Sequence, residues 1–153
     1  MSIIEQKAYS LGLKIPEAPK PVAAYIPGVM SQKLIFTSGQ LPIENGEIKY
    51  IGKAGDSISA EEAYRAAKLC TLNCLGVIKS LVKDLDQVER IIKLTGFVNS
   101  TESFAEQPQV VNGASELVSI LFGEKGAHAR CAVGVNSLPL GVVCEVEMIV
   151  QVR

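Results

Sequence analysis

The last quarter of the chain, residues 126–153, limits the possible folds more than any other stretch. It reads GAHARCAVGVNSLPLGVVCEVEMIVQVR, with short apolar alternation on both sides of the Leu-Pro-Leu-Gly sequence at 138–141. Such alternation is typical of β-strands, and proline followed by glycine predicts a turn. We therefore expect two C-terminal strands, one opened by Arg130 and one covering 142–152, joined as a hairpin within a sheet.

The second of these strands has two chemically different faces. Glu145 and Glu147 are two residues apart, so the pleat of a strand points both side chains to one face. The residues that point to the other face are apolar: Cys144, Val146, Met148 and Val150. The apolar face predicts core, whereas Arg130 and two acids near the ends of packed strands indicate a site of chemistry.

Composition and charge exclude several classes of protein. A chain of 153 residues, 48% hydrophobic and 20% charged, is typical of one soluble globular domain. The 15 Lys and Arg are scattered among 16 acids, and a net charge of −1 argues against nucleic acid as a partner. Apolar runs are shorter than the ~20 residues of a membrane span. Glu5 and Lys7 stand where a signal peptide needs an apolar centre, so we expect a cytoplasmic protein.

The four cysteines do not form a metal-binding pattern. Cys70 and Cys74 are four residues apart, and Cys131 and Cys144 fall on the two C-terminal strands. No CxxC pair occurs, and His128 is the only histidine. Structural zinc sites require closely spaced pairs of such ligands, so we expect no metal and mostly buried, free thiols.

The first third of the chain predicts an arm followed by strands. Residues 1–20 form this N-terminal arm, which is weakly amphipathic at first and then proline-rich, so its second half is extended along the fold. Residues 24–29 predict a turn or an edge strand, and residues 33–38 predict a strand. The Asn-Gly dipeptide at 45–46 predicts a hairpin over residues 44–51.

Two helices flank a long strand in the middle of the chain. Ser59 and Glu62 match a capping box, which predicts the start of the first helix. Residues 85–99 predict the strand, Pro108 suits the first turn of the second helix, and Gly123 ends that helix. Two helices cannot cover both faces of a five- or six-stranded sheet. We expect them on one face, with copies of the same chain against the other.

The sequence resembles the RidA/YjgF family, the reactive intermediate deaminases that are also labelled L-PSP endoribonuclease-like. The resemblance covers residues 21–153, a single domain, and indicates a longer-chain branch of the family. The motifs that carry it are AAYIPGV with Tyr25, LIFTSGQLP at 34–42, FVNSTESF at 97–104, VVNGAS at 110–115 and HARCAVGVNSLPLGVVCEVEMIV at 128–150. Arg130 and Glu145 stand at the spacing of the family's most specific signature.

The resemblance implies both a fold and an activity. The fold is α+β, a chorismate-mutase-like mixed sheet with two helices on one face, assembled as a homotrimer with sites in the clefts between subunits. The activity is hydrolysis of reactive 2-imino and 2-enamino acids to 2-oxo acids and ammonia, without metal or organic cofactor. An alternative is a protein that senses small carboxylates with the same pocket and turns nothing over. RNA cleavage, from the family's older name, is disfavoured by the lack of basic clusters.

The resemblance also assigns roles to residues. Arg130 is the expected anchor for the substrate carboxylate, because a guanidinium holds a carboxylate through two parallel hydrogen bonds. Glu145 is the expected base or orienting group for the attacking water. The residues expected to line the pocket are Tyr25, Ser38, Gly39, Asn112, Ser115 and Cys131. The last two depart from the family pattern, which has tyrosine at the position of Ser115 and commonly serine at that of Cys131.

Simpler readings of these residues remain open from the sequence. Arg130 can form a structural ion pair with Glu145 or Glu147 that secures a subunit interface. His128 can act as a base in the site or pack beside the strand without a chemical role. Cys131, next to an arginine, can be an activated thiol, although a buried strand cysteine is the commoner case.

Overall fold

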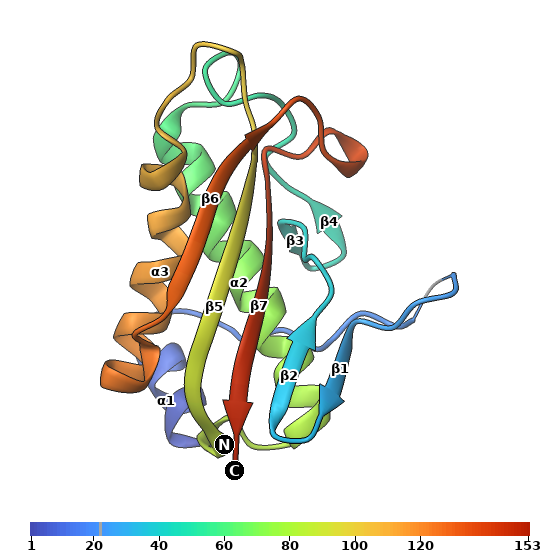
Figure 1. Cartoon of the computed structure of the whole chain (residues 1–153), viewed down its shortest axis with the longest axis vertical. Helices are drawn as coiled ribbons and strands as arrows, with labels where there is room; N and C mark the ends of the chain where they lie inside the picture. The colour runs from blue at the N-terminus through green and yellow to red at the C-terminus, as the bar shows by residue number, and fades with distance from the viewer. Residues whose placement is uncertain (22) are drawn as a thin grey trace.

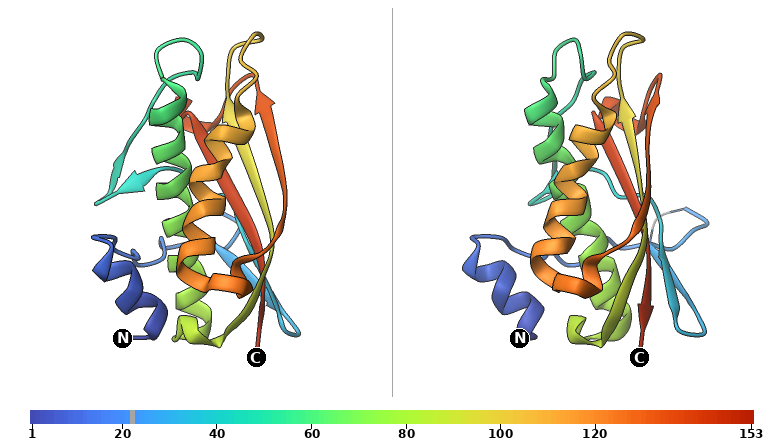
Figure 2. Two further views of the ribbon diagram at one scale, coloured as in Figure 1. Left: turned by 90° about the vertical axis from the view of Figure 1, so that its left-hand side faces the viewer. Right: turned by 60° about the vertical axis from the view of Figure 1, so that its left-hand side comes forward.

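The computed structural model, which describes residues 1–21 and 23–153, has a five-stranded sheet with two long helices on one face (Figures 1 and 2). The strands lie in the order β1–β2–β7–β5–β6. Their bounds are Gly28–Ser31 (β1), Leu34–Thr37 (β2), Val88–Asn99 (β5), Ala129–Val135 (β6) and Cys144–Val152 (β7). The helices are α2 (Ala60–Val82) and α3 (Gln107–Phe122). Both lie on the same side of the sheet in the two views of Figure 2, which confirms that prediction.

The predicted C-terminal hairpin is wrong, because β5 lies between β6 and β7. β5 pairs in parallel with β6 and antiparallel with β7, and its Phe97 has Val133 and Glu145 as its two partners. Passing over one strand requires about 10 Å, a distance that residues 136–143 easily span. Apolar alternation identified both strands correctly, but it carries no information on which strands are neighbours.

α2 begins where the capping box predicts. The Ser59 hydroxyl accepts from the Glu62 N–H at 3.1 Å, and the Glu62 carboxylate accepts from the Ser59 N–H at 3.2 Å. The side of the helix that faces the sheet carries small, buried residues: Ala63, Ala66, Ala67, Cys70 and Cys74. Small side chains allow the helix axis to approach the strands closely.

α3 also follows the sequence prediction. Pro108 lies in its first turn, and Gly123 ends it with a φ of 59° that disfavours other residues. Gly113 lets α3 touch α2, because a side chain there would overlap the backbone carbonyl of Tyr64. The helix layer is therefore one tightly packed pair.

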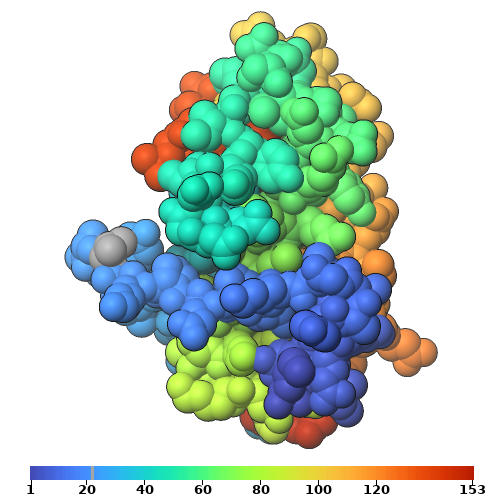
Figure 3. All heavy atoms as spheres, turned by 180° about the vertical axis from the view of Figure 1, so that it is seen from behind, coloured from blue at the N-terminus to red at the C-terminus, as the bar shows by residue number. Residues whose placement is uncertain are grey.

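The start of the N-terminal arm folds as a helix, α1 (Ile3–Ser10), where the sequence indicated only a weakly amphipathic segment. The carboxylate of Asp86, from the turn before β5, accepts from the N–H groups of Ile3 and Ile4 at 2.8 and 3.1 Å. The proline-rich residues 14–21 then run without regular structure, as predicted. Figure 3 shows this N-terminal segment crossing the back of the molecule over α2.

The Asn-Gly hairpin is confirmed as a separate two-stranded ribbon. β3 (Ile43–Glu44) pairs with β4 (Glu47–Ile48), and Asn45 and Gly46 between them have φ angles of 52° and 79°. Two consecutive residues with positive φ match the type I′ turn that an Asn-Gly sequence favours.

The hydrophobic core fills the space between the sheet and the helices. On β7 the four apolar residues predicted to face inward, Cys144, Val146, Met148 and Val150, are at most 1% exposed. Glu145 and Glu147 alternate with them on the face without helices. Within residues 1–21 and 23–153, no helix is both long and apolar enough to cross a membrane.

Candidate functional site

Arg130 on β6 points toward the helix layer. Its register partner on β5 is Leu94, which is fully buried under the helices, so both side chains lie on that face. The guanidinium meets the first turns of α3. Its Nη1 donates to Asn112 Oδ1 at 2.8 Å and to Ser115 Oγ at 3.1 Å, and its Nη2 donates to the Pro108 carbonyl at 3.3 Å. The structure therefore brings together three of the predicted site residues.

These contacts leave part of the Arg130 guanidinium free for a ligand. A guanidinium has five N–H donors, and the three bonds use both donors of Nη1 and one of Nη2. The Nε–H and one Nη2–H, on two nitrogens of the same planar group, have no acceptor among residues 1–21 and 23–153. Arg130 forms no ion pair with any carboxylate in the part of the chain that the structure describes. The structural pair with Glu145 or Glu147 is thus not formed within one chain.

His128 is connected to this cluster through Ser115. The Ser115 Oγ lies 2.8 Å from His128 Nε2, and His128 Nδ1 lies 2.6 Å from the Gly126 carbonyl oxygen. His128 immediately precedes β6 and lies two positions before Arg130 in the sequence. The sequence left open whether this imidazole belongs to the site, and the structure places it in direct contact with the residue that binds Arg130.

Glu145 lies on the opposite face of the sheet from Arg130. It is in register with Phe97, on the face without helices, and its carboxyl group is beside Gly39. A Cβ at Gly39 would lie 2.8 Å from the carboxyl carbon of Glu145 and 2.9 Å from Oε2. Partial burial, and then the charge of Glu147, raise the pKa of Glu145 above its ordinary value.

The segment beside Glu145 contains Ser38 and Gly39, and a hydrogen bond links it to the loop that carries Tyr25. Gln40 pairs with Val146 of β7, and this pairing holds Ser38 and Gly39 against the start of that strand. The Ser38 hydroxyl donates to the Ile26 carbonyl at 2.7 Å, which ties down the loop that carries Tyr25. Tyr25 itself is 60% exposed.

Cys131 falls in neither contact network. It follows Arg130 on β6, so its side chain points to the face without helices, in register with Thr95. Cys131 is exposed, and the other three cysteines are buried and free. Burial raises the pKa of the Cys74 thiol to about 12. Residues 1–21 and 23–153 contain no group of three or more His, Cys, Asp or Glu arranged to hold a metal ion.

All the predicted site residues except Cys131 thus fall in two clusters on opposite faces of the sheet. The arginine cluster contains Arg130, Asn112, Ser115 and His128, and the glutamate cluster contains Glu145, Gly39, Ser38 and the Tyr25 loop. Sequence reasoning missed the carbonyl groups of Pro108 and Gly126, because a backbone acceptor leaves no mark on residue type. One chain does not bring Arg130 and Glu145 together.

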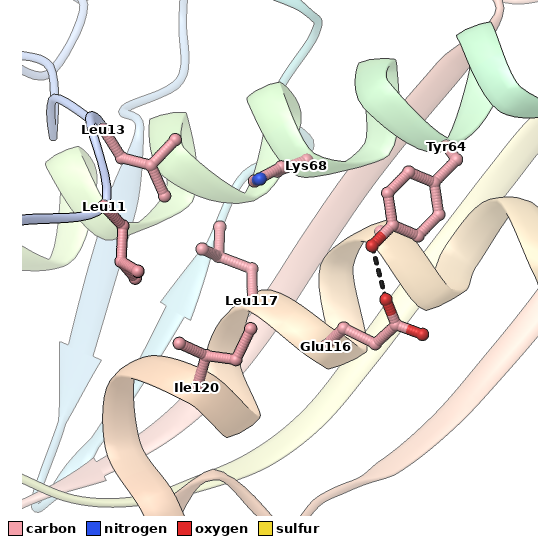
Figure 4. Close-up of a pocket in the computed structure, with 8 residues that line it drawn as sticks. Leu11, Leu13, Tyr64, Lys68, Glu116, Leu117 and Ile120 are labelled. Atoms are coloured by element: carbon pink, nitrogen blue, oxygen red, sulfur yellow. Dashed lines mark hydrogen bonds between the residues drawn. The ribbon is translucent and has the colours of Figure 1, made fainter.

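Two hollows of the chain have neither Arg130 nor Glu145 in their walls. One of about 140 Å³ is bounded by the N-terminal arm, α2 and α3, and none of the predicted site residues lines it (Figure 4). In it the Tyr64 hydroxyl donates to the Glu116 carboxylate, a bond that raises the pKa of Tyr64. A more open hollow of about 520 Å³ lies at the start of β6, where His128 is one of its walls.

Comparison with known proteins identifies the family. The family described as "YjgF/chorismate_mutase-like, putative endoribonuclease" matches residues 5–152. The protein TCP17 of Trypanosoma cruzi is 43% identical over 144 residues, which cover 94% of this chain and 90% of TCP17.

Solved structures agree in fold. The crystal structure of Atu1372 from Agrobacterium tumefaciens, described as of unknown function, has a TM-score of 0.94 and 42% identity and covers 99% of this chain and 93% of that one. TdcF of E. coli, solved with bound serine, has a TM-score of 0.60 and 27% identity and covers 90% and 94% of the two chains. These matches confirm the resemblance read from the motifs and the chorismate-mutase-like α+β fold. The chain belongs to the RidA/YjgF family.

Proposed function

We propose that the protein hydrolyses 2-imino and 2-enamino acids to 2-oxo acids and ammonia, in clefts between copies of the chain. The observation that carries this proposal is the state of Arg130. Three protein acceptors fix its guanidinium, and two donors, the Nε–H and one Nη2–H, remain unpaired within the described residues. Two such donors match the two oxygens of a carboxylate, the group that every 2-imino acid carries.

The need for a second copy follows from the two separated clusters. Arg130 faces the helix layer and Glu145 faces the opposite side, so one chain cannot place both at one substrate. The face of Glu145 also carries exposed apolar side chains: Val29, Leu34, Phe36 and Val133. Apolar surface of this kind is typical of an interface, and a second copy packed there can carry its own arginine cluster to Glu145. We propose a homotrimer, as the family resemblance implies.

The chemistry requires a water molecule and a proton acceptor. With the carboxylate held by Arg130, the imine carbon is attacked by water, and Glu145 takes a proton from that water as the C–O bond forms. The raised pKa of Glu145 makes it a stronger base than an ordinary carboxylate. The proton then passes to the nitrogen, which gives a carbinolamine. Glu145 next takes the proton of the carbinolamine hydroxyl and delivers it to the same nitrogen, the C–N bond breaks as the C=O bond forms, and ammonia and the 2-oxo acid leave. TdcF, which is similar in fold, was solved with serine, itself a carboxylate.

A coupled assay tests the proposal. A dehydratase that releases an enamine is mixed with the purified protein, and formation of the 2-oxo acid and ammonia is followed. We expect faster release than in buffer, loss of this acceleration in Arg130→Ala, and a large loss in Arg130→Lys, which keeps the charge without the fork. Arg65→Lys, on the exposed side of α2, is the matched control.

The outcomes separate the candidate functions. No acceleration by the parent protein, or equal acceleration by Arg130→Ala, overturns the proposed hydrolysis. Saturable binding of 2-oxo acids that depends on Arg130, without ammonia release, identifies a carboxylate sensor instead. Cleavage of RNA that survives purification and disappears in Glu145→Gln supports the family's older label.

A further inference from the structure

We propose that Ser115 and His128 are positioning residues that fix the Arg130 guanidinium in its ligand-binding orientation. This inference rests on the proposed carboxylate site. Its basis is a continuous row of hydrogen bonds from the backbone to the guanidinium. His128 Nδ1 lies 2.6 Å from the Gly126 carbonyl oxygen, His128 Nε2 lies 2.8 Å from Ser115 Oγ, and Arg130 Nη1 donates to the same Oγ at 3.1 Å.

The backbone carbonyl determines the tautomer of the imidazole. A carbonyl oxygen only accepts, so the Nδ1 of His128 must carry the hydrogen in the bond to Gly126. In the neutral ring Nε2 then has a lone pair and no hydrogen. When the ring is neutral, the Ser115 hydroxyl must therefore donate its hydrogen to Nε2 across the 2.8 Å contact.

The tautomer of His128 in turn determines whether the lone pairs or the hydrogen of the Ser115 hydroxyl face Arg130. With its hydrogen directed to His128, the Ser115 oxygen presents lone pairs to the guanidinium, which is the polarity that a cation requires. Without an acceptor at His128, the hydroxyl rotates freely and points its hydrogen toward Arg130 part of the time. The guanidinium then keeps two firm partners, Asn112 Oδ1 at Nη1 and the Pro108 carbonyl at Nη2, and its plane is held less firmly than by three acceptors.

A pair of histidine variants separates positioning from simple packing. Asparagine at 128 places an amide nitrogen near the position of Nδ1, so it preserves the bond to Gly126 but does not reach Ser115. Glutamine is one carbon longer and places its amide at the position of Nε2, where its oxygen accepts from Ser115. Ser115→Ala removes the hydroxyl that links His128 to Arg130. Ser119→Ala, at an exposed position of the same helix, is the control.

Binding of pyruvate to the assembled protein, measured by calorimetry, gives the first readout. We expect His128→Asn and Ser115→Ala to weaken binding by about tenfold, the effect of losing one hydrogen bond to a charged group. His128→Gln and Ser119→Ala should bind pyruvate nearly as tightly as the parent. Equal affinity of His128→Asn and the parent overturns the inference while leaving the proposed function intact. Equal pyruvate affinity of parent and Arg130→Ala overturns the carboxylate site itself.

A second readout does not depend on ligand. His128 is the only histidine of the chain, so its two ring nitrogens give unique signals in the ¹⁵N spectrum of the labelled protein. At a pH where the ring is neutral, we expect hydrogen on Nδ1 and none on Nε2. We also expect the Nε2 signal to shift in Ser115→Ala. The opposite tautomer, or an Nε2 signal unaffected by Ser115→Ala, overturns the inference.

Discussion

At the scale of single residues, Arg130 differs from Arg65 and Arg153, the two arginines that pair with carboxylates in the described residues. Arg65 and Arg153 pair with exposed glutamates on the surface, and such pairs contribute little to stability. Arg130 is half-buried and bonded only to neutral acceptors within the described residues. A cation held in this way retains its full attraction for an anion, which is the property that a carboxylate site needs.

Gly39 gives a test of the glutamate cluster. Gly39→Ala would place a methyl group 2.8 Å from the Glu145 carboxyl carbon and push the carboxylate aside. Because displacement of a catalytic group by about 1 Å can cost on the order of a hundredfold in rate, we expect turnover to fall between about tenfold and a hundredfold. Pyruvate binding at Arg130 and the melting temperature should change little. Unchanged turnover would show that Glu145 does not handle the water.

The identity of the site residues was more predictable than their arrangement. The signature spacing selected Arg130 and Glu145, and the sequence also named Asn112 and Ser115, which bind the arginine. Glu145 and Glu147 share a face because they are on one strand. Arg130 is on another strand, and its face depends on the register between strands. A single sequence does not contain that register, so the separation of the clusters was not foreseen.

At the scale of elements, the N-terminal helix is attached by charge as well as by packing. Glu5 of α1 pairs with Lys79 of α2, and the Glu5 side chain is only 12% exposed. The hydrogen bond from Lys79, followed by that from the Ser2 N–H, lowers the pKa of Glu5 from its ordinary value of 4.5 to about 2. Together with the hydrogen bonds to Asp86, these contacts hold α1, which the sequence predicted only as part of an arm, against the rest of the fold.

The depressed pKa predicts how stability changes with acid. A carboxyl group with a lower pKa in the folded state stabilises the protein above its unfolded pKa, and this contribution disappears as pH falls through the folded pKa. We expect Glu5→Gln to be less stable than the parent near neutral pH, by up to about 1 kcal/mol. Urea unfolding should show this difference shrinking between about pH 4.5 and pH 2. A difference that is constant over this range would contradict the assigned pair.

Elements were predictable where a local signal marked their ends. Capping and positive φ are local requirements, so the residues that satisfy them located the element boundaries: Ser59 with Glu62, Pro108, Gly123 and the Asn-Gly turn. The insertion of β5 between the last two strands had no such signal. Strand pairing is a long-range property, and two strands close in sequence are only more often neighbours.

At the scale of the whole molecule, only one face of the sheet is covered by helices. Helices cover one side, while Phe36 and Val133 on the other side are 41% and 42% exposed. We expect Phe36→Glu to dissociate the assembly and to abolish turnover, because a buried unpaired charge at an interface is costly. Sedimentation measures the mass. Ile120→Glu, at an exposed apolar position of α3, should leave the assembly unchanged. An intact, active oligomer of Phe36→Glu would show that copies do not meet on this face.

If each site takes Arg130 from one copy and Glu145 from another, mixing two inactive variants must restore activity. Arg130→Ala and Glu145→Gln are each expected to be inactive as pure assemblies. When equal amounts are dissociated and reassembled together, random mixing pairs an intact arginine with an intact glutamate at about one site in four. We predict recovery of about a quarter of the parental turnover. If the mixed assembly is no more active than the two variants separately, the two residues do not meet across copies and the proposed site is wrong.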